Sequence, residues 1–199
     1  MTETRARLRR ELRARRRAIP AAQRIAAAQS LALRLLELPF APTSGHVAGY
    51  WAMDGEIALH AWQLQLPPEL IYCLPVLCRD ERLRFAPWRP GGALASNRFG
   101  IPEPEVPLSS LIEPEAMSLV VMPLVGFDAS GERLGMGGGW YDRSFAFRKA
   151  QAPPPWLVGA AFAMQQCDRI VRQPWDVALD AVCTDDATLI APGVPTGLP

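Results

Sequence analysis

The residues best suited to chemistry lie in one stretch, where glycines stand among charged and aromatic side chains. Residues 126–143 read GFDASGERLGMGGGWYDR, and four of the five positions from 135 to 139 are glycine. A backbone with so few Cβ atoms can adopt positive φ angles and let a bulky anion contact its N–H groups. A flexible linker has little use for the flanking Arg133, Tyr141, Asp142 and Arg143. The stretch therefore predicts a phosphate-binding loop rather than a simple turn.

The elements on either side place this loop between a strand and a helix. The apolar run LVVMPLV at 119–125 has the length and composition of a buried strand. Residues 141–149 predict a helix with Asp142 in its first turn and Arg148 and Lys149 in its last, which suits the helix dipole. Its unpaired N–H groups would point toward the same anion. Trp140 occupies a position that the P-loop and dinucleotide-binding motifs reserve for other residues, so neither motif applies.

Length and composition favour one globular domain. The chain has 199 residues, is 49% hydrophobic and carries a net charge of +1. It contains no apolar run near the roughly 20 residues of a membrane span, and no apolar segment follows the N-terminal arginines as in a secretory signal. Four cysteines lack C-x-x-C spacing, which predicts reduced, mostly buried thiols in a cytoplasmic protein. With two histidines in the chain, we expect no histidine-based metal site.

The N-terminus predicts a basic helix over residues 4–18. Residues 5–17 contain eight arginines, and Arg5, Arg9 and Arg13 follow one another at four-residue spacing. Such a helix is usually a solvated face and sometimes binds nucleic acid. Pro20 opens a second predicted helix that runs to about Leu38.

The remaining pattern predicts further strands with a long loop between them. Strands are expected at 46–51, 70–76, 83–88 and 156–162, with a helix at 57–66 and a loop at 89–115. Pro75 is expected to mark the end of its strand. The turn Met53-Asp54-Gly55-Glu56 follows the first strand, at the carboxyl end where open α/β sheets bind ligands. Glu56 could equally stabilise the dipole of the helix that follows it.

Residues 126–143 resemble the signature of the 5-formyltetrahydrofolate cyclo-ligase family, and the resemblance extends from Arg5 to about Thr184. It implies an α/β fold: a single three-layer α/β/α Rossmann-like domain with a mostly parallel sheet. We assign this domain to residues 1–191 and expect 192–199 to form a loose tail. The implied reaction consumes 5-formyltetrahydrofolate and ATP and yields 5,10-methenyltetrahydrofolate, ADP and phosphate.

The resemblance also implies roles for individual residues. ATP would contact Arg5, which replaces a lysine of the family, together with Arg9 and the loop residues Arg133, Leu134, Gly135, Met136, Gly137, Gly138, Gly139, Trp140 and Tyr141. The folate substrate would contact Trp51, Glu56, Gly137, Gly138, Trp140 and Tyr141. Asp142 and Asp180 would hold Mg²⁺, with Arg133 and Tyr141 as catalytic residues. Many relatives have a lysine within the glycine loop; this chain has none, and Arg133 is the first candidate to supply that charge.

Two alternatives stay open at this point. A sugar-phosphate isomerase or CoA-transferase-like enzyme would need a base opposite the loop, and only Glu56 could serve. A nucleic-acid-binding protein would use the arginine-rich helix and leave the glycine loop without a role. The resemblance to the cyclo-ligase family instead predicts small-molecule partners, a monomer, and no binding to nucleic acid or membranes.

Overall fold

A computed structural model describes residues 2–195, including the side chains from residue 5 onward. Its centre is a seven-stranded sheet in the order β11-β10-β9-β6-β1-β2-β3. Five strands run parallel: β1 (Gly45–Ala48), β2 (Leu70–Leu77), β6 (Leu119–Pro123), β9 (Trp156–Ala160) and β10 (Ala181–Cys183). The edge strands β3 (Leu83–Pro87) and β11 (Thr188–Ile190) are antiparallel to their neighbours. The predicted α/β fold with a mostly parallel sheet is confirmed.

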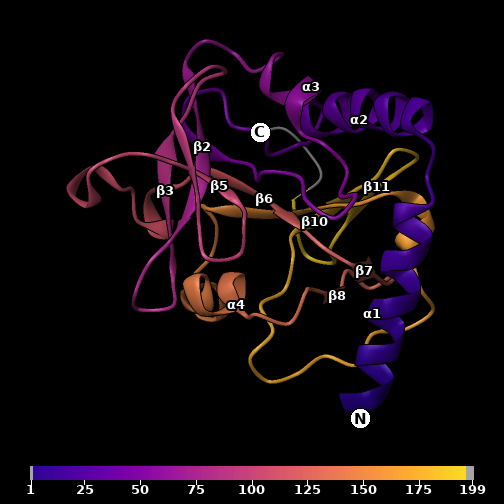
Figure 1. The fold of residues 1–199 in the computed structure, drawn as a ribbon. Helices are drawn as coiled ribbons and strands as arrows, with labels where there is room; N and C mark the ends of the chain where they lie inside the picture. The colour runs from indigo at the N-terminus through magenta and orange to yellow at the C-terminus, as the bar shows by residue number, and fades with distance from the viewer. Residues whose placement is uncertain (1, 196–199) are drawn as a thin grey trace.

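Helices cover both faces of this sheet (Figure 1). α2 (Ala21–Leu36) and α3 (His60–Gln63) pack on one face, and α4 (Trp140–Ser144) lies on the other. Val121 belongs to the core under α2, whereas its neighbour Val120 belongs to the core under α4. Because both faces are covered, the central strand reads as a continuous apolar run.

α1 (Thr2–Arg17) stands at one side of the sheet, next to the small β7–β8 hairpin (Figure 1). β7 (Gly126–Phe127) and β8 (Arg133–Leu134) pair antiparallel and lead directly into the glycine loop. Leu12 of α1 packs in a small core with Val125 and Leu134. A Cβ on Gly126 would lie 2.5 Å from the Leu12 side chain, so glycine is what allows α1 to approach the hairpin this closely.

Two predicted helices and several predicted strand ends differ in the structure. The strand expected at 46–51 ends at Ala48, and the strand expected at 156–162 ends at Ala160. The helix expected at 57–66 is reduced to the four residues of α3. The helix expected at 141–149 divides into α4 and a 3-10 turn over Ala146–Lys149, because Phe145 leaves helical geometry and buries its ring against Phe85. Pro75 does not end β2. β1 pairs with β2 only as far as Cys73, so proline is tolerated where that strand edge is free.

The loop expected at 89–115 contains a second hairpin. β4 (Leu94–Ser96) and β5 (Pro102–Pro104) pair antiparallel, and 3-10 turns follow at Leu108–Ser110 and Pro114–Ala116. The Asn97 side chain closes the hairpin by accepting hydrogen bonds from Phe99 N at 2.8 Å and Ile101 N at 3.1 Å. A further 3-10 turn covers Ala163–Gln165.

Other sequence expectations concern the ends of the chain and its special residues. Of the tail expected at 192–199, residues 196–199 lie outside the described residues. All four cysteines are free; Cys73 and Cys183 are buried, and Cys78 and Cys167 are half-buried. Within residues 2–195, no helix has the length and apolar composition needed to cross a membrane.

Candidate functional site

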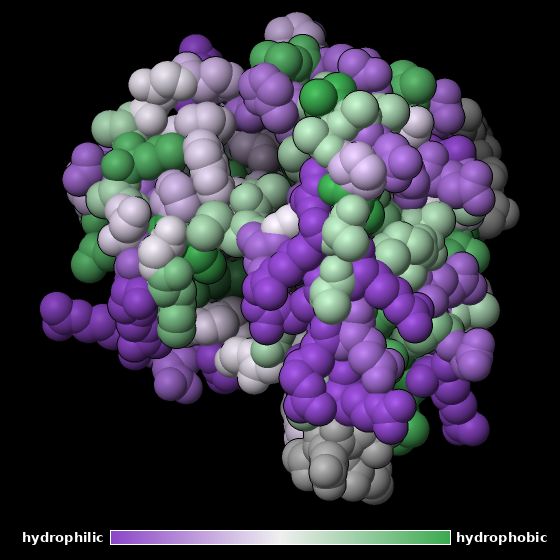
Figure 2. Space-filling view, turned by 45° about the vertical axis from the view of Figure 1, so that its right-hand side comes forward, coloured by the Kyte–Doolittle hydropathy of each residue, from purple (hydrophilic) through white to green (hydrophobic). Residues whose placement is uncertain are grey.

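A cavity of about 620 Å³ opens at the carboxyl ends of β1 and β6, the position at which parallel α/β sheets bind ligands. Its walls come from α1, the turn after β1, the glycine loop, the β4–β5 hairpin and the segment 169–176. Figure 2 shows hydrophilic side chains gathered over α1, with a hollow beside them where hydrophobic surface is exposed. The cavity therefore has one strongly polar wall and apolar surfaces facing it.

The glycine loop presents bare backbone to this cavity. Among the described residues, the N–H groups from Gly135 to Gly139 find no hydrogen-bond acceptor. Gly137 has a φ of +101°, and a Cβ there would lie 3.6 Å from the guanidinium carbon of Arg9. Gly139, with a φ of +67°, precedes the first turn of α4. The loop is open and faces Arg9, as an anion-binding backbone requires.

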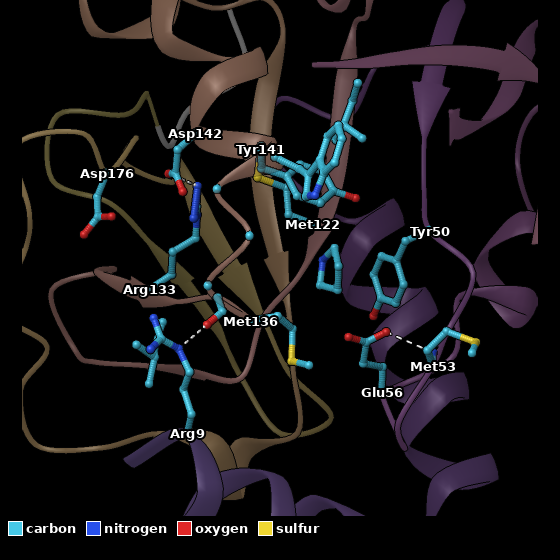
Figure 3. A pocket seen from close by; sticks show the side chains of 18 of the residues that line it. Arg9, Tyr50, Met53, Glu56, Met122, Arg133, Met136, Tyr141, Asp142 and Asp176 are labelled. Atoms are coloured by element: carbon cyan, nitrogen blue, oxygen red, sulfur yellow. Dashed lines mark hydrogen bonds and ion pairs between the residues drawn. The ribbon is translucent and has the colours of Figure 1, made fainter. Parts of the chain in front are cut away.

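Two arginines of α1 lie against the loop and the segment opposite it. Arg9 Nε donates to Gly135 O at 2.8 Å, a contact visible in Figure 3. Arg5 donates to Val171 O at 3.2 Å and lies 3.3 Å from a carboxylate oxygen of Asp176. Burial, and next the charge of Arg5, lower the pKa of Arg9 from its ordinary value. The negative charge of a bound anion would offset both effects.

Arg133 and Asp142 form an ion pair in the cavity wall. Arg133 Nη2 lies 2.6 Å from Asp142 Oδ1, and that oxygen also accepts a hydrogen bond from Val177 N at 3.1 Å. Arg133 is buried, and its Nε has no hydrogen-bond partner within the described part of the chain. A buried donor without a partner is costly unless a ligand satisfies it.

The aspartate that accompanies Asp142 in the cavity is Asp176, not Asp180. Figure 3 shows the Asp142 and Asp176 carboxylates on the same side of the pocket, near Arg133. Asp180 precedes β10 at the amino end of the strand and does not line the cavity. Its carboxylate instead lies 3.0 Å from Arg148 and accepts a hydrogen bond from Leu157 N at 2.7 Å. The structure therefore does not bring Asp180 to the cavity beside Asp142, as the predicted metal pair would require.

The opposite wall contains a buried carboxylate and two tyrosines. Glu56 Oε2 accepts a hydrogen bond from Met53 N at 2.9 Å, and burial raises the pKa of Glu56 above its ordinary value. Tyr50 donates from its hydroxyl to Ile57 O at 2.7 Å. Burial, and next the charge of Glu56, raise the pKa of Tyr50 and of Tyr141. Both phenols stay protonated at neutral pH, so Tyr141 can donate a hydrogen bond but cannot act as a ready base.

Two tryptophans stand at the rim. Trp51 is 37% exposed and meets Trp88 edge-on, with ring centroids 5.7 Å apart. Trp140 lies between Arg98 and Arg143, whose guanidinium carbons are 5.5 and 5.2 Å from its ring. Flat aromatic surfaces of this kind suit a planar ligand.

Comparison with known proteins identifies the protein family. The model of the 5-formyltetrahydrofolate cyclo-ligase family matches residues 1–185. The chain belongs to this family. It is 34% identical to the 5-formyltetrahydrofolate cyclo-ligase of Haemophilus influenzae over 182 residues, covering 89% of this chain and 96% of that protein. The enzyme of the same name from Escherichia coli K12 is 33% identical over 177 residues, covering 87% and 96%.

Solved structures agree with the family assignment. The 5,10-methenyltetrahydrofolate synthetase of Aquifex aeolicus superposes with a TM-score of 0.79 at 26% identity, covering 94% of this chain and 93% of the other. The synthetase of Mycoplasma pneumoniae superposes with a TM-score of 0.69 at 22% identity and shows the same fold. The chain is therefore an enzyme of the cyclo-ligase family.

Within this cyclo-ligase fold, every predicted site residue except Asp180 lines the one cavity. Sequence reasoning missed Leu8, Tyr50, Met53 and Asp176, which line it as well. Tyr50 stands beside Trp51 at the end of a predicted strand, and this position was a usable signal. Asp176 lies in the same stretch as Asp180, and no periodicity in the sequence distinguishes the two.

Proposed function

We propose that the protein converts 5-formyltetrahydrofolate to 5,10-methenyltetrahydrofolate and couples this to the cleavage of ATP into ADP and phosphate. The observation that carries the proposal is a single cavity with two chemically distinct walls. The unpaired N–H groups of the glycine loop face Arg9 on one side, and the buried carboxylate of Glu56 lies on the other. One wall suits a polyphosphate and the other a heterocycle with N–H donors.

The chemistry follows from the nature of the substrate. The formyl group on N5 is an amide, and its oxygen leaves poorly when N10 attacks the carbonyl carbon. Transfer of the γ-phosphoryl group of ATP to that oxygen converts it into a good leaving group. N10 then attacks the carbon and closes the ring, its proton passes to solvent, the C–O bond breaks, and inorganic phosphate departs. The protein must chiefly align the reactants and neutralise the spreading negative charge.

The phosphate wall has the groups for that task. The loop N–H groups from Gly135 to Gly139 bind phosphate oxygens, and Arg9 and Arg5 add positive charge from α1. Arg133, whose Nε is unsatisfied among the described residues, donates to the transferred group and replaces the loop lysine that the chain lacks. Positive charge placed where negative charge develops lowers the barrier to phosphoryl transfer.

Asp142 and Asp176 are the residues suited to hold Mg²⁺. Both line the cavity, and each keeps one carboxylate oxygen that accepts no hydrogen bond from the side chains and backbone that the structure describes. Two carboxylates beside a polyphosphate are a usual protein contribution to a hydrated Mg²⁺. The ion supplies charge neutralisation on the phosphates when bound. Arg133 orients the Asp142 carboxylate through their 2.6 Å contact.

The opposite wall binds the folate. Glu56 accepts hydrogen bonds from N–H groups of the pterin, and the Tyr141 hydroxyl, kept protonated by its burial, donates one in return. Trp51 and Trp140 flank the ring system at the rim, and Gly137 and Gly138 leave room beside it. We propose that the enzyme acts as a cytoplasmic monomer on small molecules.

The structure disfavours the nucleic-acid alternative. Three of the arginines in the basic run, Arg13, Arg16 and Arg17, are bound to the carboxylate of Asp54, and Arg16 is fully buried there. Two others, Arg5 and Arg9, face the cavity. Five of the eight arginines are thus engaged by groups of the protein itself, which favours a role at the cavity over binding along a phosphate backbone.

The deciding experiment follows the absorbance of methenyltetrahydrofolate after folinic acid, ATP and Mg²⁺ are mixed with the protein. We expect product formation that depends on all three, with one ADP released per product. Absence of product at high enzyme concentration would overturn the proposed function.

A further inference from the structure

The turn that carries Glu56 is closed by local hydrogen bonds from Glu56 N to Met53 O and from Met53 N to the Glu56 carboxylate, both at 2.9 Å. Asp54 adopts a φ of +52°, a left-handed conformation that is uncommon for a residue with a side chain, and Gly55 follows with a φ of +77°. Asp-Gly is a dipeptide that favours this pair of left-handed conformations. Further contacts to the turn come from the N-terminal helices, far away in sequence.

Four arginines form hydrogen bonds to this turn. We refer to Arg13, Arg16, Arg17 and Arg24 as the arginine clasp. Arg13 Nε lies 2.7 Å from Asp54 Oδ2, and Arg17 also binds the Asp54 carboxylate. Arg24 donates to Gly55 O at 2.9 Å and to Arg16 O at 2.8 Å, so it joins the turn to the end of α1. A Cβ on Gly55 would lie 2.8 Å from the Arg24 guanidinium at a φ of +77°, so a larger residue there would strain the backbone and displace Arg24.

Arg16 is the centre of the arginine clasp. It is fully buried, and its three guanidinium nitrogens donate to Asp54 O at 3.2 Å, Asp54 Oδ2 at 2.9 Å and Leu124 O at 3.2 Å. Leu124 directly follows β6, so this one side chain ties the turn after β1 to the end of the neighbouring strand. Arg16 Nη1 also lies 3.9 Å from Glu56 Oε1. The guanidinium therefore reaches both the backbone that carries Glu56 and the carboxylate itself.

We infer that Arg16 and Asp54 are positioning residues for folate binding, which orient Glu56 and keep it charged without contacting the substrate's reacting atoms. This inference rests on the proposed function, in which Glu56 contacts the pterin. Loss of the buried guanidinium would leave Asp54 O and Leu124 O without their donor and would remove the charge that faces Glu56.

The effect of the clasp is specific to the folate side because the nucleotide side of α1 is held separately. Arg9 binds Gly135 O, Arg5 binds Asp176, and Leu12 is buried between Val125 and Leu134. These contacts lie one to three helical turns before Arg16. Loss of the clasp therefore leaves the ATP contacts in place.

The test compares the variants Arg16→Met, Arg16→Lys and Asp54→Asn with the control Arg15→Gln, whose side chain is exposed on the same helix. Dissociation constants are measured by calorimetry for folinic acid and, separately, for ATP with Mg²⁺, and melting temperatures are recorded alongside. Losing charge-assisted buried hydrogen bonds should weaken folinic acid about tenfold or more in Arg16→Met, and ATP by less than about twofold. Arg16→Lys should fall between wild type and Arg16→Met, because an ammonium keeps the charge but cannot serve three acceptors.

Equal weakening of both ligands, or no weakening of folinic acid, would overturn the inference and leave Arg16 with a purely structural role. If Arg16→Met does not fold, as judged by circular dichroism, Asp54→Asn decides by the same criterion. A wild-type protein that turns over no folinic acid would instead reject the proposed function, so the two failures are separable.

Discussion

Replacing Asp176 and Asp180 separately by asparagine distinguishes a metal-site carboxylate from a structural one. Asp176 lines the cavity, lies 3.3 Å from Arg5 and accepts a hydrogen bond from Gln173 N at 2.9 Å. Asp180 lies outside the cavity and pairs with Arg148, both side chains being largely buried. Asparagine keeps the size and one acceptor oxygen of each residue, so the change is one of charge.

The two substitutions should change different quantities, the Mg²⁺ affinity and the stability of the fold. Without the Asp176 charge, the apparent affinity for Mg²⁺ should fall by about 10- to 100-fold, the range seen when groups that support a metal ligand are lost. Without the Asp180 charge, the Arg148 guanidinium is left buried and uncompensated, at a cost of about 3 kcal/mol. For a chain of this length, that cost lowers the melting temperature by roughly 6 to 12 °C.

The assay is a Mg²⁺ titration of the initial rate at saturating ATP and folinic acid, with free Mg²⁺ corrected for ATP chelation. Thermal melting of both variants without ligands provides the second measurement. Asp176→Asn should shift the Mg²⁺ requirement, and Asp180→Asn should shift the melting temperature while its Mg²⁺ requirement stays near wild type. The reasoning is refuted if Asp180→Asn raises the Mg²⁺ requirement and Asp176→Asn leaves it unchanged.

Three more predictions concern the two walls of the cavity. Gly137→Ala imposes a Cβ at a φ of +101° and should raise the KM for ATP in steady-state kinetics; an unchanged KM would contradict the geometry. Arg9→Ala removes a cation and the contact to Gly135 O, so it should weaken ATP by about tenfold or more while folinic acid changes little; isothermal calorimetry on both ligands checks this. Burial raises the pKa of Glu56, so folinic acid affinity should fall as pH drops through that raised value, and Glu56→Gln should lose this dependence. The same raised pKa affects stability. Protonated Glu56 favours the folded state below its unfolded pKa, and this contribution is lost as pH rises through the folded pKa. The melting temperatures of wild type and Glu56→Gln, measured between about pH 4 and 8, should therefore converge at low pH.

The local sequence pattern was enough to predict those elements whose own residues favour one structure. The run at 119–125 has the composition of a strand covered on both faces, and it forms the centre of the sheet as β6. The glycines at 135–139 allow a bare, open backbone whatever surrounds them, and the structure places that backbone in the cavity wall. Helix ends were less predictable, because the break at Phe145 comes from packing against Phe85 rather than from any helix-breaking residue.

Contacts between distant segments were decided only by the tertiary structure. The eight arginines at 5–17 predict a basic helix, but five of them have partners at positions 54, 124, 135, 171 and 176, which no local pattern connects to them. Asp176 and Asp180 are four residues apart in one acidic stretch, and either could meet a metal on sequence grounds alone. The chain reaches the amino end of β10 at Asp180 after passing the cavity at Asp176, so the direction of that strand determines which carboxylate faces the substrates.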